Sequence, residues 1–540
     1  MGHPGFGESA AADIDVRLVP AALTSWMVTA AGIWWPIGRV VALCCLALVA
    51  ASGALACYPA RRPGRTTPLR AISAGLMAIG VVGAGFGLAI ALRADAVGRH
   101  PITAAFGMTA PVTVTPTESA LSLGSGRLMF RATLQRLRAD EMSGRVVVFA
   151  RASDFGSETG GVTSGVMVGQ PVRFTARINR PVRHDLTVAV LNASGRPTMG
   201  TAGAVERAAH AVRSRFAAAV RDALPAEQAA MLPALVLGDT SAVTTETGRE
   251  FRAAGMTHLT AVSGANVTIV CMAVLFSARL IGPRAAVVLA AVALVAFVIV
   301  VQPTASVLRA AVMGAIALAG MLSSRRRQAI PALSATVLVL LAVAPHLAVD
   351  VGFALSVLAT AALVVIAPVW SRRLVGRGWP KPLADAFAVA WAADVVTAPL
   401  VAGISGRVSL VAAGANLAVA PVIAPITVLG SAAAVLCLVW LAGAQLLIHF
   451  TGPELWWVLH VAHWAAAVPA ATVPVPAGVP GVLLVGGATV LVLLAATLLW
   501  RWRWFRAAVG SVVVVLVICL LAWLLPELSD PGTAAVVGPS

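Results

Sequence analysis

The sequence predicts a polytopic α-helical membrane protein with about 12–13 spans, and a small extracytoplasmic β-barrel domain inserted after the N-terminal spans. Composition predicts the membrane part: of 540 residues, 59% are hydrophobic and 11% are charged, and the mean hydropathy is +0.90. Soluble domains do not have such a composition. The barrel is predicted because a long polar region interrupts the apolar runs and alternates apolar and polar residues in short stretches.

The N-terminal part begins with a polar cytoplasmic segment, residues 1–20, and continues with membrane helices over 21–92. A helix that crosses the hydrocarbon core needs roughly 20 apolar residues, because its backbone polar groups must be satisfied within the segment. Runs that fit this requirement are at 37–57 and 71–92, and a shorter span is predicted at 21–35. No short hydrophobic region ends in a cleavage site, so these spans are expected to remain in the mature chain.

A second series of apolar runs fills residues 255–500 and is predicted to form the transmembrane core. Its spans are predicted at 258–280, 285–301, 305–322, 329–345, 350–369, 383–402, 410–425, 427–448 and 480–499. A last span is predicted at 507–525, and an extracytoplasmic tail, residues 526–540, follows it.

Positive residues predict the orientation of these spans. The formal net charge is +17, and Lys381 is the only lysine, so arginine carries almost all of the positive charge. Loops that face the cytoplasm collect such residues. If the spans alternate, the arginine clusters within 61–70, 325–327 and 372–377 all lie on the cytoplasmic side. This places residues 93–257 outside and predicts a multi-pass protein of the bacterial plasma membrane.

The first part of the polar region, residues 100–200, is predicted to form the barrel. It contains five alternating runs, at 111–116, 126–137, 144–150, 168–178 and 185–191. It also contains eleven arginines against six acidic residues. A small basic barrel is a common binder of single-stranded nucleic acid, although it can equally be an inert spacer. The candidates for contact with a polyanion are Arg127, Arg131, Arg145, Arg173 and Arg177.

The second part, residues 204–254, has helical spacing and balanced charge, which predicts amphipathic helices at the outer membrane surface.

The sequence has no pattern typical of an enzyme. The six cysteines all lie in apolar runs, which predicts neither disulfides nor a metal site. His460 and His463 stand one turn apart without a third ligand nearby. There is neither a nucleotide-binding loop nor a metallohydrolase signature. The chain is therefore expected to have no catalytic activity, no cofactor and no metal.

The stretch 251–267 is unusual because it carries polar residues into a predicted span. Polar groups at that depth are costly unless they pair or face water. The alternative interpretation is helix packing, in which Ser and Gly permit close approach. If the segment lines a path for an anion, the candidates are His258, Ser263, Gly264 and Asn266.

Few other charged residues lie within the predicted spans. Arg309, roughly one turn inside its helix, is expected to reach the interface, pair with an acid or face an aqueous path. Asp350 is predicted to cap a helix, and Asp394, in mid-span, to pair with an arginine or couple to protons. Because residues 410–426 combine Asn416 with a glycine and two prolines, that helix is predicted to break and line a pathway.

Five motifs follow one another in the sequence. They are ALVLGDTSAV at 234–243, GMTHLTAVSGANV at 255–267, PTASVLRAAVM at 303–313, DVGFALSVLAT at 350–360 and SLVAAGANLAVAPV at 409–422. In this order they resemble the ComEC competence family of DNA-uptake channels, whose hallmark is a His-Leu pair followed by Ala-Val-Ser-Gly. Ala265 and Asn266 stand where many members have Leu and His, so no role is carried over to a second histidine.

The resemblance implies an OB-like fold for residues 100–200, a competence-type channel core at 255–500 and inward transport of one DNA strand. It implies single-stranded DNA as ligand, with an extracytoplasmic DNA receptor and a cytosolic helicase or ATPase as partners. Asp239, Asp350 and Asp394 would be structural or coupling residues. Many members also carry a C-terminal metallo-β-lactamase-like domain thought to degrade the other strand, and this chain is expected to lack it. A homo-oligomer is left open.

The leading hypothesis is a membrane channel for inward translocation of single-stranded DNA during natural transformation. The alternative is a secondary transporter for a smaller anionic solute, with Asp394 as the coupling group. A third class, a membrane scaffold without a pore, would tolerate polar substitutions throughout the spans.

Overall fold

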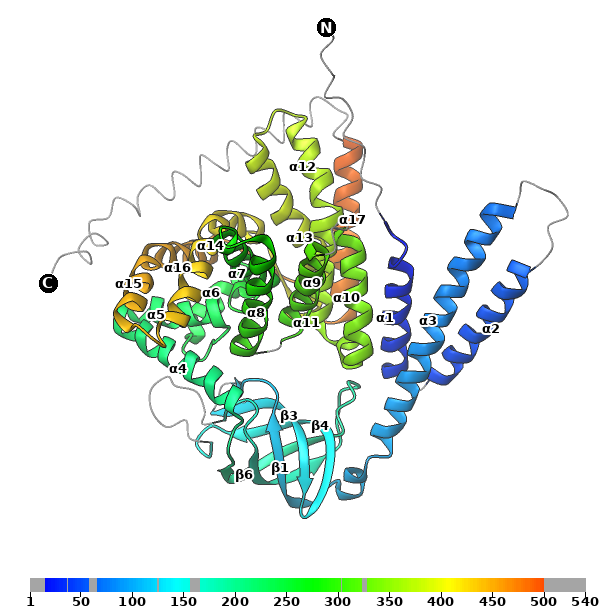
Figure 1. Ribbon diagram of the computed structural model, residues 1–540, viewed down its shortest axis with the longest axis horizontal. Helices are drawn as coiled ribbons and strands as arrows, with labels where there is room; N and C mark the ends of the chain where they lie inside the picture. The colour runs from blue at the N-terminus through cyan, green and yellow to red at the C-terminus, as the bar shows by residue number, and fades with distance from the viewer. Residues whose placement is uncertain are drawn as a thin grey trace, which may run out of the picture. The chain divides into compact units, whose positions relative to one another are not determined.

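The structure is a computed structural model that describes residues 15–35, 37–57, 66–123, 126–155, 166–302, 304–322 and 328–499 (Figure 1). The predicted span 507–525, the tail 526–540 and most of the cytoplasmic segment 1–20 lie outside these residues. The chain forms two compact units, one of Met1–Thr397 and Ser409–Val473, the other of Ala398–Val408 and Pro474–Ser540. The candidate site lies in the first unit.

Three helices open the first unit: α1 (Val19–Trp34), α2 (Gly38–Cys57) and α3 (Thr66–Gly98). They confirm the predicted helices at 21–35, 37–57 and 71–92, and α3 continues beyond its predicted end. Small residues let the helices approach closely. A Cβ atom added at Gly87 of α3 would lie 3.2 Å from Ala42 of α2.

The polar region forms the predicted barrel. It contains η1 (Pro101–Ala105), β1 (Thr109–Pro116), β2 (Leu121–Ser122), β3 (Arg127–Leu137), β4 (Asp140–Arg151), β5 (Val172–Asn179) and β6 (Ala189–Met199). The order β1-β5-β6-β4-β3 closes into a five-stranded barrel because β1 also pairs with β3, and β2 adds only to the edge of β3. Strand β4 runs parallel to β6, and the other pairs are antiparallel.

The barrel closes because every second residue is apolar and points inward. Val112, Phe130, Val148, Phe174 and Leu191, one from each strand, are all buried in its interior.

Helices α4 (Ala204–Ala223), α5 (Ala226–Leu237) and α6 (Thr245–Ala253) follow the barrel. The expectation for residues 204–254 was amphipathic helices at a surface, and α4 and α6 do bury one side only. The middle helix differs, because every residue from Met231 to Leu237 is buried. Its sequence is apolar all round from that point, so it packs inside the helical core.

The remaining helices form the core. They are η2 (Thr257–Leu259), α7 (Gly264–Ala278), α8 (Pro283–Val301), α9 (Ala305–Leu322), α10 (Ala329–Val343), η3 (Pro345–Val349), α11 (Val351–Val365), α12 (Ala367–Val375), α13 (Lys381–Ser405), α14 (Ala412–Leu436), α15 (Leu441–Phe450) and α16 (Gly452–Ala467). Strands β7 (Arg407–Ser409) and β8 (Thr472–Pro474) are short, and α17 (Val479–Leu499) belongs to the second unit.

Within the described residues, five helical segments are long and apolar enough to cross a membrane. They are Ser73–Ala105, Pro283–Val301, Val351–Val375, Lys381–Ser405 and Ala412–Leu436. The other apolar helices of the core are shorter, so length alone does not give them a full span.

The predicted break in the helix at 410–426 is wrong. Helix α14 runs without interruption from Ala412 to Leu436, with Pro421 and Pro425 inside it. Prolines four residues apart lie on the same face of a helix, so their lost hydrogen bonds fall on one side and the opposite side can continue. The predicted helix at 427–448 is accordingly replaced by the end of α14 and by α15.

Candidate functional site

The turn that enters α7 is built from the unusual polar stretch of the sequence. Ser263 Oγ donates a hydrogen bond to Asn266 Oδ1 at 3.1 Å, and Asn266 Nδ2 donates to the carbonyl of Leu235 in α5 at 2.8 Å. Asn266 is buried, and both the oxygen and the nitrogen of its side-chain amide help to fix the turn. Since the Ser263 hydroxyl serves Asn266, it forms no cap on the first N–H groups of α7.

Arg309, on α9, lies directly against this turn. A Cβ atom added at Gly264 would lie 2.6 Å from Arg309 Nη2. The guanidinium donates from Nε to Ser356 Oγ of α11 at 2.6 Å and from Nη1 to Met313 Sδ at 3.3 Å. Only 7% of the residue is exposed. Among the described residues no carboxylate forms an ion pair with it.

Two positive features therefore meet at one place. The N-terminus of a helix carries a partial positive charge and points N–H groups outward, and an anion placed there is stabilised. Arg309 adds a full positive charge beside Gly264, with no acidic residue to neutralise it among the described residues. Together the two features favour an anion over a cation at this place.

A small cavity borders the same turn. Leu235, Ser263, Asn266, Ile426 and Thr427 are among its lining residues, and its volume is about 10 Å³. That is room for about one water molecule, and its lining includes three polar side chains.

The other motifs meet the turn through close backbone contacts. Val262 packs against Gly238, where a Cβ atom would lie 3.1 Å from its Cγ2. Gly255 packs against Ala412 of α14, and Ser409 Oγ donates to the carbonyl of Ala253 at 2.7 Å. With Arg309 and Ser356, all five sequence motifs converge on one cluster.

The remaining predicted polar residues of the core form no described hydrogen bond or ion pair with Arg309. His258 lies in η2, and Asn416 Oδ1 in α14 is enclosed without a hydrogen-bond partner in the described part of the chain. Asp350 Oδ1 accepts from the N–H of Phe353 at 2.8 Å, which confirms the predicted cap of α11. Asp394, half-buried in α13, has no ion pair with an arginine among the described residues.

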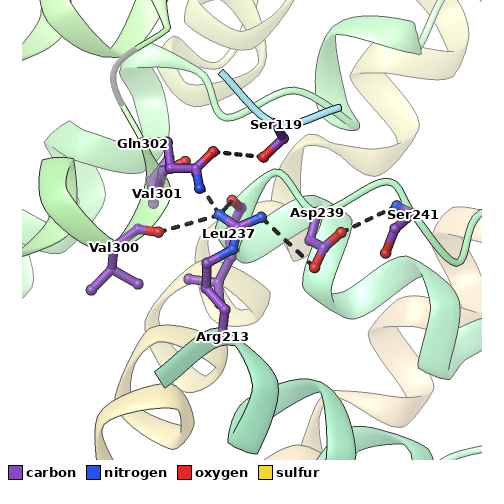
Figure 2. A network of polar contacts seen from close by, with 8 residues as sticks. All are labelled: Ser119, Arg213, Leu237, Asp239, Ser241, Val300, Val301 and Gln302. Atoms are coloured by element: carbon purple, nitrogen blue, oxygen red, sulfur yellow. Dashed lines mark hydrogen bonds and ion pairs between the residues drawn. The ribbon is translucent and has the colours of Figure 1, made fainter. Parts of the chain in front are cut away.

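Asp239 belongs to a second polar network, shown in Figure 2. Its Oδ1 accepts from the N–H of Ser241, and its Oδ2 lies 3.7 Å from Arg213 Nη2. Arg213 Nη1 also donates to the carbonyls of Leu237 at 3.2 Å, Val300 at 3.2 Å and Val301 at 3.4 Å. These are last-turn carbonyls of α5 and α8, which lack partners within their own helices. Arg213 thus joins the C-termini of two helices.

The same network reaches the barrel. Ser119 lies in the loop after β1, and Gln302 directly follows α8. Ser119 Oγ donates a hydrogen bond to Gln302 Oε1 at 2.6 Å (Figure 2). Gln302 has a φ of +77°, a left-handed conformation uncommon for residues other than glycine. The barrel is therefore connected to the end of α8 by a side-chain hydrogen bond.

Sequence reasoning did not single out Arg213. A signal was present, because Ala209, Arg213, Phe216 and Val220 stand at helical spacing, and the other three are buried. An arginine among the buried positions of an amphipathic helix indicates that its side chain has a buried hydrogen-bonding or charged partner.

The five candidate arginines of the barrel differ in their surroundings. Arg173 and Arg177 alternate with buried residues on β5 and are exposed. The Arg127 guanidinium lies 5.9 Å from the centre of the Phe149 ring. Arg131 donates two hydrogen bonds of 3.1 Å to the Glu118 carboxylate.

Arg145 is the one of the five that is enclosed. Its Nη1 has no hydrogen-bond partner in the described residues. Burial lowers the pKa of Arg145, and the positive charge of Arg131 lowers it further. Arg173 and Arg177 are therefore the freest of the five for an external polyanion.

Comparison with known proteins gives a family match for the helical core. The sequence model of a family described as "Competence protein" matches residues 235–505. The match begins inside α5 and includes the α7 turn, Arg309 and Ser356. Neither the curated proteins nor the solved structures contain a match to the chain.

Proposed function

This chain belongs to the competence protein family, and from that premise we propose that it is the membrane channel through which single-stranded DNA enters a bacterial cell during natural transformation. The family indicates a role in DNA uptake, and the five long apolar helices indicate a membrane protein. The channel itself, its placement as a multi-pass protein of the plasma membrane and the direction of transport are our proposal.

The observation that carries the proposal is the contact between Arg309 and the start of α7. A charged side chain buried among apolar helices is costly, and such residues usually mark a functional path. Arg309 has no carboxylate partner among the described residues, so a passing phosphate can take that place. Because the site holds one charge and one helix end, it favours phosphates without retaining a whole strand.

The barrel supports the same function. We propose that the barrel is OB-like, which its closed five-stranded order and the parallel β4–β6 pair support, and OB folds commonly bind single-stranded nucleic acid. Arg173 and Arg177 project from β5, and Arg127 lies beside the half-buried ring of Phe149. Positive charge with an aromatic ring is a typical platform for stacked bases. We propose that the barrel gathers the strand outside the membrane.

In this proposal the chain moves DNA and performs no hydrolysis. An extracytoplasmic receptor would deliver the strand, and a cytosolic helicase or ATPase would draw it inward. No cofactor or metal is required for that role.

A second candidate function is secondary transport of a smaller anion. Asp394 favours it, because only its backbone carbonyl accepts a described hydrogen bond, from Thr397 Oγ1 at 3.5 Å, and its carboxylate is left for a proton. In vesicles, anion flux driven by a proton gradient and abolished by Asp394→Asn would support this function over a DNA channel.

The test of the DNA channel uses a gene deletion complemented with variants. We would measure labelled DNA bound at the cell surface separately from DNA protected inside. Arg309→Gln should leave surface binding unchanged and lower protected DNA roughly 10- to 100-fold, the range expected for one charged hydrogen bond. Arg309→Lys should retain part of the uptake, because lysine keeps the positive charge but lacks the planar guanidinium that can donate two parallel hydrogen bonds to a phosphate.

The matched control is Arg279→Gln. Arg279 is exposed just after α7, with its guanidinium 3.9 Å from the centre of the Phe276 ring, and its loss should change little. Normal uptake by an inserted Arg309→Gln protein would remove Arg309 from the path. Normal uptake in the deletion strain would remove the channel function altogether.

A further inference from the structure

A groove lies between α1, α3 and α10, away from the candidate site. Its volume is about 250 Å³. Its walls are mostly apolar, with Val81, Phe86 and Ile90 of α3 facing Leu341 of α10. Among the described residues that line it, Arg93 is the only charged one. The groove therefore has an apolar body and one cationic residue.

The length of the groove matches one leaflet of a bilayer. Val81 and Arg93 both line it, and at 1.5 Å per residue they stand about 18 Å apart along α3. The hydrocarbon core of a bilayer is about 30 Å thick, so one leaflet is about 15 Å deep. If Arg93 lies at the interface, the apolar part extends about to the membrane centre.

Neighbouring residues place Arg93 at an interface. Trp34 and Trp35, at the end of α1, are exposed by 53% and 57%, and such residues concentrate where hydrocarbon meets headgroups. Gly38, at the start of α2, packs against Ala91. The turn between α1 and α2 is therefore beside α3 close to Arg93.

Arg93 is held at the groove without being neutralised. Its Nη2 donates to the carbonyl of Ala342, in the last turn of α10, at 3.2 Å. No carboxylate among the described residues pairs with it, whereas nearby Arg39 is paired with Asp95. An arginine has five N–H donors, so several remain for an anion.

Gly85 keeps the groove open. A Cβ atom added there would meet no atom within 4 Å, although Gly85 lines the groove. Gly80 of the same helix serves helix packing instead, since a Cβ atom there would lie 2.7 Å from Val49 of α2. A larger side chain at Gly85 would therefore start from open space, and we expect it to occupy the groove.

We propose that this groove binds an anionic phospholipid, with one acyl chain against α3 and α10 and the phosphate at Arg93. A free phosphate would use only Arg93 and leave the apolar body empty. A partner helix is about 10 Å across, so even one turn of it, about 5.4 Å long, occupies more than the volume of the groove. Basic residues beside grooves between membrane helices commonly hold such headgroups.

The test is a lipid titration of the full chain in detergent, followed by native mass spectrometry. Dioleoyl phosphatidylglycerol should bind about fivefold more tightly than dioleoyl phosphatidylcholine, the ratio expected for one arginine near a membrane surface. Arg93→Gln should abolish this preference. Gly85→Leu should weaken the binding of both lipids, because leucine fills the groove.

Two variants serve as matched controls. Gly75→Leu places the same side chain on an exposed, open part of α3, and Arg99→Gln removes the same charge just beyond that helix. Neither should alter lipid binding. Equal binding of the two lipids by the unaltered chain, or equal losses in the control variants, would overturn the proposal. Competition by millimolar inorganic phosphate would also overturn it, because a plain anion site would then suffice. If Gly85→Leu fails to fold, Arg93→Gln still decides.

Discussion

Arg309 Nη2 lies so close to Gly264 that a Cβ atom there would stand 2.6 Å away. Glycine at this position is therefore what allows the guanidinium to reach the first turn of α7. The two residues belong to different motifs, and their contact explains why an arginine in one motif accompanies Ser-Gly in the other. It also yields a prediction that leaves the arginine itself unchanged.

Gly264→Ala should displace Arg309 from the helix end without unfolding the protein. The contacting atom is the tip of a flexible side chain, so it can move away at small cost in stability. With the guanidinium shifted, we expect protected DNA to fall about 10-fold, close to the loss of one charged hydrogen bond. Uptake and membrane insertion would be measured in the complemented deletion strain.

The control is Gly414→Ala in α14, where a Cβ atom meets no atom within 4 Å. It should leave uptake unchanged. If Gly264→Ala transports DNA as well as this control does, the position of the guanidinium is unimportant.

The sequence predicted the parts of this site but could not predict their contacts. Residue spacing along a strand or helix is local, so it predicts the barrel, the first three helices and the cap at Asp350. The contact between Arg309 and Gly264 depends on how α7 and α9 pack, which no periodicity encodes. The resemblance supplied the motifs in order without saying that they meet.

Two expectations from local sequence patterns were not met by the structure. Prolines favour a break in a helix, yet α14 passes through Pro421 and Pro425 because both lie on one face. Arg145 alternates with buried residues on β4 and was a candidate for contact with a polyanion, but its Nη1 atom is enclosed. The first exception is a matter of helix geometry, and the second depends on what packs against the outside of the barrel.

His346 should make the stability of the chain depend on pH. It lies in η3, and burial lowers its pKa from 6.5 to about 4, helped by the positive charges of Arg145 and Arg131 and opposed by Asp185. The folded state thus favours the neutral ring. Its stabilisation is complete above about pH 6.5 and is lost as the pH falls towards 4.

We therefore expect the thermal midpoint of the purified chain to drop more between pH 7.5 and pH 5 than that of His346→Gln. The exposed His210 of α4 provides the control substitution, His210→Gln, which should retain the full pH dependence. Parallel curves for the unaltered chain and His346→Gln would show that this ring is not held neutral.

Arg173 and Arg177 should contribute to the binding of single-stranded DNA through phosphate contacts. Each contact on a single strand adds about 0.7 to the slope of log affinity against log salt. Replacing both arginines with glutamine should therefore weaken binding and reduce that slope by about 1.4. Fluorescence anisotropy of a labelled oligonucleotide with the full chain in detergent measures both quantities.

A charge-matched control comes from the same barrel. Arg136 is exposed but forms an ion pair with Glu141, so Arg136→Gln should change the salt dependence little. Equal slopes for the unaltered chain and the double variant would mean that the strand binds another face, such as the one with Arg127 and Phe149.

Arg213 should matter more for stability than its acidic partner does. The ion pair with Asp239 is long, at 3.7 Å, whereas the carbonyls of Leu237 and Val300 each accept a hydrogen bond of 3.2 Å from Arg213. Arg213→Gln leaves helix-end carbonyls of both α5 and α8 without partners, and we expect a loss of about 1–3 kcal/mol for each helix end that loses its hydrogen bonds. Asp239→Asn removes only the charge and keeps those bonds.

We expect Asp239→Asn to cost about 1 kcal/mol, within the range of partly exposed ion pairs. The order of the thermal midpoints in detergent should therefore be unaltered chain, Asp239→Asn, then Arg213→Gln. If the two variants were equally destabilised, the ion pair would be the main interaction and the carbonyl bonds secondary.

Arg213→Gln should also loosen the attachment of the barrel. Gln302 directly follows Val301, whose carbonyl accepts a hydrogen bond from Arg213, and the Gln302 side chain accepts the hydrogen bond from Ser119. We therefore expect faster proteolysis in the loop after β1.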